Sequence, residues 1–200
     1  MWETFLMNLQ NTTWTEGIAV AFGLASVWYA KKENILVFPT GIVSVLIYMY
    51  ITFFAKLYAD MTINFFYFVM SVYGWYMWTH HNSVKEQRPI SWCSKKEHYI
   101  SIAGLIIFYF GMYYVLANHT DSDVPMIDSL TTAIFIVGMY LMALKKIENW
   151  IYWIIGDLIS VPLYIYKGLI LSSFQFFIFL LLAVAGYIEW RQRYREAKAL

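Results

Sequence analysis

The sequence predicts an all-α integral membrane protein with seven transmembrane helices. Of its 200 residues, 60% are hydrophobic and only 14% are charged, whereas a soluble domain carries about 25% charged residues. Several apolar runs approach the length of about 20 residues that crosses a bilayer as a helix. The net charge of +1 gives no basis for nucleic-acid binding, and a single cysteine, Cys93, excludes an internal disulfide.

Seven apolar segments follow one another along the chain, and short polar segments separate them. The helices are expected at about residues 14–30, 34–55, 57–79, 98–117, 126–144, 147–166 and 168–190. The polar breaks lie at residues 31–33, 56, 80–97, 118–125, 145–146 and 167, and a basic tail begins at residue 191. Because several breaks hold only two or three residues, the helices that they join must be adjacent and antiparallel.

The basic residues test this count of seven. With seven helices, one side of the membrane holds only Lys56 and Lys167. The other side holds the remaining twelve of the 14 basic residues, namely Lys31, Lys32, Lys85, Arg88, Lys95, Lys96, Lys145, Lys146, Arg191, Arg193, Arg195 and Lys198. The positive-inside rule places the rich side in the cytoplasm. We therefore expect the N-terminus outside and the C-terminus inside.

The chain also shows signs of an internal duplication. The segment 31–34 (Lys-Lys-Glu-Asn) resembles the segment 145–149 (Lys-Lys-Ile-Glu-Asn), and each precedes an apolar stretch with one Gly, one Pro and a Tyr-x-Tyr. Residues 73–78 and 185–190 match as well. This pattern predicts a single transporter domain of the form 3+1+3. Two parallel three-helix repeats, about 14–79 and 126–190, are joined by a linker helix at about 98–117 and can enclose a site.

The second copy carries the more distinctive residues. Asp157 lies ten residues into its helix, where a charged group is costly and normally faces the protein interior or a cavity. Trp150 and Trp153 precede it by seven and four residues, so all three share a helix face. Indole faces and a carboxylate suit a flat, cationic, aromatic ligand. The alternative is that Trp150 anchors the helix at the membrane interface and Asp157 bonds a neighbouring helix.

In the register suggested by the Glu-Asn pairs, Trp150, Trp153 and Asp157 take the places of Ile35, Phe38 and Gly41 or Ile42. The proposed binding chemistry is therefore not symmetric. The first half contributes through Asn64 and Tyr67, one turn apart in its third helix, and Asn64 could instead join two helices by a hydrogen bond. Asp60 and Gln175 are further polar candidates within the predicted helices.

These residues resemble the PnuC (Pnu-type) vitamin transporters. The similarity runs from about Glu16 to Trp190, and its specific element is the family's Trp-x-x-Trp-x-x-x-Asn/Asp motif, present as Trp150, Trp153 and Asp157. The family's Gln-x-x-Tyr motif falls on Asn64 and Tyr67, with the glutamine replaced. Further matching stretches are 33–41, 57–60, 73–75, 148–164 and 167–169, and these add Asn149 and Tyr164 to the candidate binding residues.

The resemblance implies a plan like that of the SWEET sugar transporters, in a bacterial cytoplasmic membrane. It implies facilitated diffusion of an unphosphorylated vitamin by a homotrimer without a cofactor, and a cytoplasmic kinase that traps the vitamin by phosphorylation. Thiamine is slightly favoured because its charge would benefit from Asp157. Nicotinamide riboside, which is also cationic, is the alternative, as is an ion-coupled symporter. An enzyme is disfavoured because the sequence has no His pair at metal spacing and no paired deep carboxylates.

Overall fold

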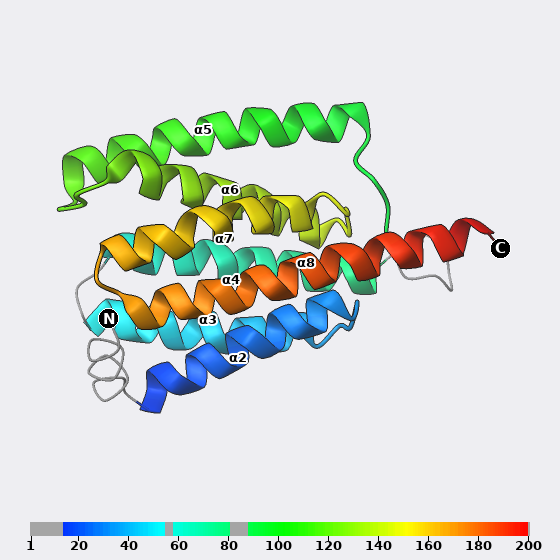
Figure 1. The fold of residues 1–200 in the computed structure, drawn as a ribbon, viewed down its shortest axis with the longest axis horizontal. Coiled ribbons are helices and arrows are strands. Elements are labelled where there is room, and N and C mark those ends of the chain that lie inside the picture. The colour runs from blue at the N-terminus through cyan, green and yellow to red at the C-terminus, as the bar shows by residue number, and fades with distance from the viewer. Residues whose placement is uncertain (1–13, 55–57, 81–87, 200) are drawn as a thin grey trace.

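The computed structural model describes residues 14–54, 58–80 and 88–199, and this part of the chain forms seven helices (Figure 1). Lys56, Leu57 and Lys85, which the sequence arguments used, lie outside the described residues. The predicted number of helices is confirmed. The helices are α2 (Trp14–Lys31), α3 (Val37–Phe54), α4 (Tyr58–Thr79), α5 (Lys95–His119), α6 (Pro125–Ala143), α7 (Asn149–Tyr166) and α8 (Ile170–Ala199).

Of the helix ends that differ from the prediction, two have clear local reasons. α5 begins at residue 95 rather than 98, because Ser94 and Glu97 form a capping box in which each side chain accepts a hydrogen bond from the other's backbone N–H. α8 continues to residue 199 rather than 190, since its charged end is rich in helix formers and is supported by the i,i+4 pair of Glu189 and Arg193.

Four of the seven helices, α3, α5, α6 and α8, are long and apolar enough to cross a membrane. The other three, α2, α4 and α7, carry more polar residues, including Asp60 in α4 and Asp157 in α7. They pack directly against the apolar four. We therefore expect their polar residues to face protein rather than lipid.

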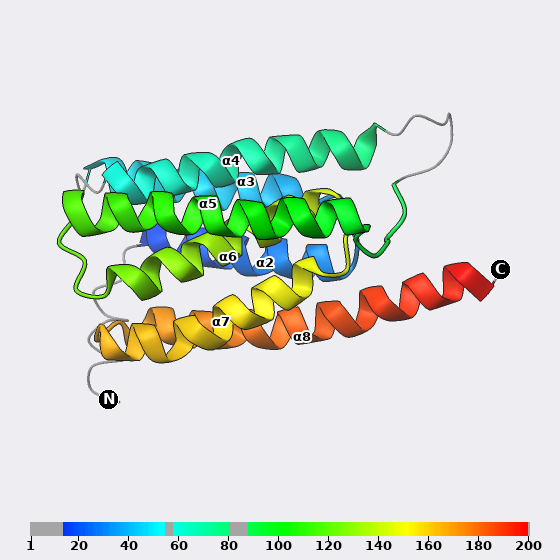
Figure 2. The ribbon, with the colours of Figure 1, turned by 90° about the horizontal axis from the view of Figure 1, so that it is seen from above.

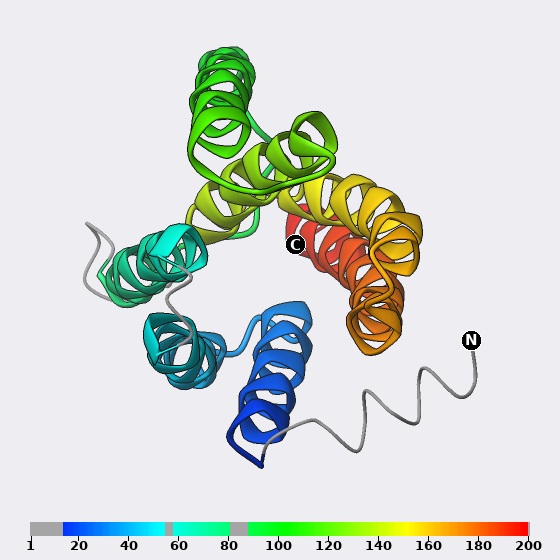
Figure 3. The same ribbon diagram turned by 90° about the vertical axis from the view of Figure 1, so that its left-hand side faces the viewer.

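Six of the helices close into a ring. Packing contacts join α2 to α3, α3 to α4, α4 to α6, α6 to α7, α7 to α8, and α8 back to α2. Figure 3, which views the helices end-on, shows this ring, with α5 packed outside it against α6. Figure 2 shows the helices running side by side along one direction. Because α6 packs against α5 on one side and against its ring neighbours α4 and α7 on the others, most of its residues are buried.

The same packing occurs twice in the ring. On one side the Phe38 ring lies at the Gly74 backbone and meets Trp78 edge-on, with centroids 5.0 Å apart and planes at 88°. On the other side the Trp150 ring lies at the Gly186 backbone and meets Trp190 edge-on, at 5.5 Å and 88°. The members of each matched pair are 112 residues apart.

The two tryptophans of this motif reach across the ring. Trp78 Nε1 donates to the Met142 carbonyl at 3.3 Å, and Trp190 Nε1 donates to the Ala30 carbonyl at 3.0 Å. Ala30 and Met142 are themselves 112 residues apart. Each tryptophan of one half therefore holds the end of the first helix of the other half.

The spacing of 112 residues between matched positions corrects the alignment of the two halves that was based on the Lys-Lys and Glu-Asn segments. Two helix ends show it directly: Glu33 and Lys145, separated by 112 residues, both have positive φ, at 56° and 51°. Each follows its helix in a Schellman turn, closed by paired backbone bonds. In the corrected register Phe38 matches Trp150, Gly41 matches Trp153, and Val45 matches Asp157. The Glu-Asn pairing was therefore wrong by three residues and the Lys-Lys pairing by two, whereas the pairing of residues 73–78 with 185–190 already has this spacing.

Candidate functional site

Asp157 is the most unusual polar group in the described part of the ring. It lies near the middle of α7, its exposed fraction is 1%, and its Oδ2 atom is buried without a hydrogen-bond partner among the described residues. The Oγ atom of Ser160, one turn further along α7, is in the same situation. Buried polar atoms normally have partners. This carboxylate is therefore available to a ligand.

The two predicted tryptophans lie against different neighbours. Trp150 is fully buried against Gly186 and Trp190 on α8, within the hydrophobic core. Trp153 is only partly buried and lies against Gly138 and Phe135 on α6. Trp153 is therefore the better placed of the two for contact with a ligand, and Trp150 supports the packing of α7 on α8.

A stack of aromatic rings runs from Trp153 across three helices. Phe135 on α6 stacks on Trp153 at 5.3 Å and 25°, and on Phe176 of α8 at 5.9 Å and 9°. Tyr164 continues the row, 4.8 Å from Phe176. Phe135 fits here because Gly156 has no side chain: a Cβ at that position would collide with its ring. The stack presents flat π-surfaces close in sequence to Asp157.

Two groups of polar side chains lie near each other on helices that are not neighbours in the ring. The Tyr48 hydroxyl on α3 interacts with the Gln175 side chain on α8, and Tyr67 on α4 interacts electrostatically with Tyr164 and Asp157 on α7. Since neither α3 and α8 nor α4 and α7 pack against each other, both interactions act across the ring's interior. Tyr67, Gln175, Tyr164 and Asp157, predicted separately, thus border one interior region.

Other predicted residues lie toward the two ends of the helices. Asn64 donates to the Asp60 carbonyl of its own helix at 2.9 Å. Asp60 interacts electrostatically with Lys167 and Asp128, which form an ion pair at 2.6 Å. At the opposite end of the helix ring, the Asn149 side chain in the first turn of α7 donates a hydrogen bond to the Lys146 carbonyl. It lies about 12 Å along the helix from Asp157, at ~1.5 Å per residue.

Sequence reasoning did not name Phe135, Phe176 or Tyr48 as site residues. Phenylalanines in an apolar helix carry no distinctive signal, because most of them face lipid or the core. One available signal was the glycine at 156, since a glycine in a helix interior often marks the close approach of a bulky neighbour.

The end of the ring that carries the Lys-Lys segments is closed by contacts between the halves. The Lys145 ammonium has an exposed fraction of 0%, lies 2.7 Å from Glu33 Oε1, and sits 4.5 Å over the Trp78 ring. Arg193 contributes a second ion pair to Glu33 at 3.3 Å. The Trp78 and Trp190 rings meet at 6.1 Å on the same end.

A family model described as "Nicotinamide mononucleotide transporter" matches residues 13–192 of the chain. The chain belongs to this family of PnuC-type vitamin transporters. The family comprises membrane transporters, so the resemblance noted in the sequence is confirmed, and the apolar helices are those of a multi-pass membrane protein.

Curated relatives span nearly the same length. The nicotinamide riboside transporter PnuC of Escherichia coli K12 is 26% identical over 93% of this chain and 88% of its own. The PnuC of Neisseria mucosa is 25% identical over 89% and 72%. The riboflavin/roseoflavin transporter RibM of Streptomyces davaonensis is 23% identical over 97% and 92%. A crystal structure of the vitamin B3 transporter PnuC has the same fold, with a TM-score of 0.73, 23% identity, and coverage of 96% and 87%.

Proposed function

We propose that the protein is a uniporter that imports nicotinamide riboside by facilitated diffusion. The observation that carries this proposal is the buried, unpartnered carboxylate of Asp157, which lies one turn from Trp153 and its aromatic stack. Nicotinamide riboside presents a flat, positively charged ring and a polar sugar. The aromatic stack would pack against the charged ring of nicotinamide riboside, and the Asp157 carboxylate would offset the charge of that ring. Tyr67 and Gln175 would hydrogen-bond the sugar hydroxyls.

The earlier preference for thiamine finds no support among these relatives. Two of those reported are named as transporters of nicotinamide riboside and one as a transporter of riboflavin. The charge of Asp157 does not discriminate between the two cationic vitamins, and the names of the relatives support nicotinamide riboside as the proposed substrate.

We further infer that the ring consists of two parallel repeats joined by α5. The matched contacts of Phe38, Gly74 and Trp78 with those of Trp150, Gly186 and Trp190 support this inference. The gathering of the basic turns at one end supports an orientation with that end, and the C-terminus, in the cytoplasm of a bacterial cell (Figure 1). The homotrimer and the trapping kinase remain predictions from the resemblance.

In this arrangement the contacts between Glu33 and Lys145, and between Trp78 and Trp190, form a cytoplasmic barrier. A substrate bound near Asp157 reaches the cytoplasm only after the two halves separate there. Transport would then alternate between this arrangement and one in which the two halves have separated at the cytoplasmic end.

Calorimetric titration of the purified protein with nicotinamide riboside, thiamine and riboflavin tests the substrate and the site together. We expect nicotinamide riboside to bind best, and Asp157→Asn to weaken it about 100-fold, since a desolvated cation loses its countercharge. Val45→Ala, at the matched position of the first half, is the control and should bind as the wild type does. Unchanged affinity in both Asp157→Asn and Trp153→Ala, with folding verified by thermal unfolding, would refute the site.

Coupling is tested separately in vesicles. A uniporter takes up nicotinamide riboside at the same rate after the proton and sodium gradients are dissipated. Uptake that stops under this treatment would favour the symporter, with Asp157 as the proton carrier.

A further inference from the structure

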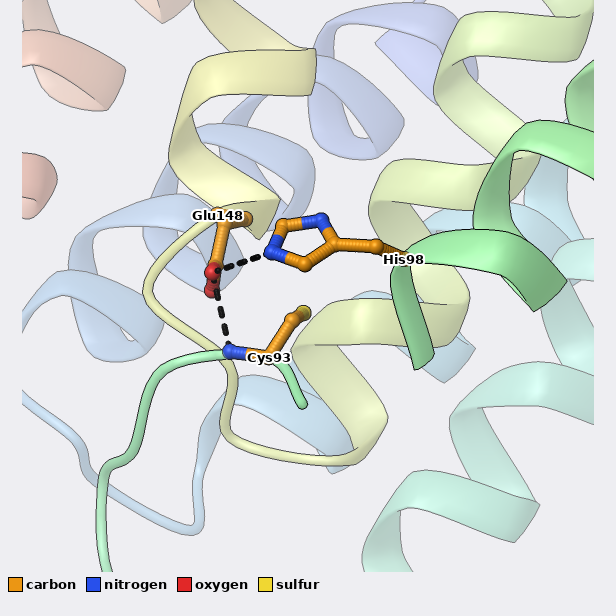
Figure 4. Close-up of side chains that lie close together, drawn as sticks. All are labelled: Cys93, His98 and Glu148. Carbon is orange, nitrogen blue, oxygen red and sulfur yellow. Dashed lines mark hydrogen bonds and ion pairs between the residues drawn. The ribbon is translucent and has the colours of Figure 1, made fainter. Parts of the chain in front are cut away.

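Three side chains with metal-binding chemistry converge at the basic end of the molecule. Cys93 lies in the loop before α5, His98 in the first turn of α5, and Glu148 in the turn between α6 and α7. Their sulfur, nitrogen and oxygen ligand atoms all lie within 4.8 Å of one another. Figure 4 shows the three side chains pointing toward one another from separate segments.

Glu148 is the fixed member of this cluster. Its side chain is 9% exposed. Its Oε1 atom accepts the Cys93 backbone N–H at 2.8 Å and lies 3.5 Å from His98 Nε2. Its Oε2 atom is buried and has no partner among the residues that the structure describes. A buried carboxylate oxygen without a donor is costly, and a bound cation would satisfy it.

The backbone around the cluster is already held in place. Ser91 N–H donates to the Lys145 carbonyl at 3.1 Å, and Ile147 N–H donates to the Ser91 carbonyl at 3.0 Å. This short bridge fixes the loop before α5 against the turn that carries Glu148. Only side-chain rotations are then needed to bring the ligand atoms to the separations of about 3.5 Å that tetrahedral bond lengths of ~2.0–2.3 Å require.

The chemistry of the three ligand atoms determines which metal ion the site would prefer. A thiolate, an imidazole and a carboxylate are ligands of Zn²⁺, whereas Mg²⁺ and Ca²⁺ prefer oxygen alone. The thiolate and the carboxylate together neutralise a divalent charge. The nearby Lys146 ammonium is paired with Glu97 at 3.0 Å, so its charge is offset. Three protein ligands leave a fourth tetrahedral position for water or for a group that the structure does not describe.

We propose that Cys93, His98 and Glu148 form a Zn²⁺ site. On binding, the cation takes the place of the thiol proton, which passes to solvent. The ion would tie the loop before α5 and the start of α5 to the α6–α7 turn, next to Lys145 and the cytoplasmic barrier. This site is separate from the vitamin site on α7, and the proposal does not depend on which vitamin is carried.

The alternative is that Glu148 only caps the loop through the Cys93 N–H. Two substitutions separate the readings, since Cys93→Ser and His98→Ala each remove a ligand atom but leave that backbone hydrogen bond available. His119→Ala, at the other end of α5, is the matched control. A polyhistidine tag must be removed before the measurement, because it would bind the metal itself.

The test is titration of the tag-free protein in detergent with Co²⁺, a spectroscopic probe for zinc sites, followed by displacement with Zn²⁺. We expect one equivalent of Co²⁺ per chain with a thiolate-to-metal absorption band. Cys93→Ser should lose the band, His98→Ala should bind at least about tenfold more weakly, and His119→Ala should match the wild type. Absence of the band in the wild type, or equal binding by all variants, would overturn the proposal. Nicotinamide riboside affinity, measured on the same samples, reports independently on the vitamin site.

Discussion

The two halves of the ring, residues 14–79 and 125–190, are alike at the end that carries the Lys-Lys segments and unlike in the middle. At the end, an aromatic ring lies on a glycine and meets a tryptophan edge-on in both halves: Phe38, Gly74 and Trp78 match Trp150, Gly186 and Trp190. Such close ring-on-backbone packing requires glycine at that position. The two halves therefore resemble each other in the packing contacts that hold their helices together.

In the middle, the contact between the first two helices of each half is built from different residues. In the first half a Cβ on Gly23 would lie 3.2 Å from the Ser44 hydroxyl, and one on Gly41 would lie 3.0 Å from that of Ser26. The matched pairs of the second half are Phe135 with Gly156 and Trp153 with Gly138. The second half therefore has large aromatic rings in pair positions that the first half fills with small residues.

Glu33 and Lys145 form a direct contact between matched positions of the two halves, 112 residues apart. Such a contact between matched positions is expected where two related halves meet at their common axis. Because one position carries an acid and the matched position carries a base, the contact between them is an ion pair, and this small asymmetry joins the two halves at the basic end.

The largest predicted effect follows from breaking this pair. Glu33→Gln leaves the fully buried Lys145 ammonium without its countercharge, and we expect the free energy of unfolding to fall by about 3 kcal/mol. Chemical denaturation in mixed micelles measures the loss. Adding Lys145→Met removes the orphaned charge and should recover most of the stability.

Glu189→Gln is the control for this pair. It breaks contacts of the more exposed Lys32 and Arg193, and it should cost less than about 1 kcal/mol. If Glu33→Gln were equally mild, the buried pair would not be what holds the two halves together at this end.

The next effect tests the matched glycines. A Cβ at Gly74 would lie 2.4 Å from the Phe38 ring, and one at Gly186 would lie 2.6 Å from the Trp150 ring. We expect Gly74→Ala and Gly186→Ala to destabilise by about 1–3 kcal/mol each, because rigid buried rings must move. Thermal unfolding in detergent measures both.

Gly111→Ala on α5, where nothing lies within 4 Å of the new Cβ, serves as the control and should be neutral or slightly stabilising. Similar losses at Gly74 and Gly186 support the matched packing. A loss at one position alone would contradict it.

The sequence predicted the helices well because apolar length and polar breaks are strong, local signals. Its match of residues 73–78 with 185–190 has the spacing of 112 that the packing shows, but its match of the second helices does not, because that comparison rested on Lys, Glu and Asn in turns. The structural match of Phe38 with Trp150 exchanges one large ring for another, so the two positions share no letter in the sequence. The Glu148 side chain accepts a hydrogen bond from the Cys93 backbone N–H, 55 residues away. Contacts of this kind leave no periodic signal.

A substitution in the middle of the second half should have a smaller effect, and this effect is on the affinity for the ligand. Phe135→Leu removes the ring that stacks between Trp153 and Phe176, so we expect nicotinamide riboside to bind about tenfold more weakly, or about 1.4 kcal/mol. Calorimetry on the folded variant measures the change. Phe177→Leu, an exposed ring on the adjacent position of α8, should leave the affinity unchanged, and an equal effect of both would remove the stack from the site.

The smallest effect concerns the two hydrogen bonds that cross the ring. Trp78→Phe and Trp190→Phe each remove an indole N–H from a helix-end carbonyl, of Met142 and Ala30 respectively. Each carbonyl keeps a backbone partner, in Lys145 and Glu33, so we expect a loss of only about 1 kcal/mol per substitution.

Trp78→Phe should be slightly the more costly of the two, because Lys145 also lies over the Trp78 ring. Denaturation of both single variants and of the double variant separates these contributions, since the two rings touch and their effects are coupled. Trp75→Phe, a more exposed tryptophan of the same helix, is the control. If only one of the two substitutions lowered the stability, only one of the two hydrogen bonds would stabilise the contact between the halves. The two tryptophans would then be similar in geometry but not in their contribution to stability.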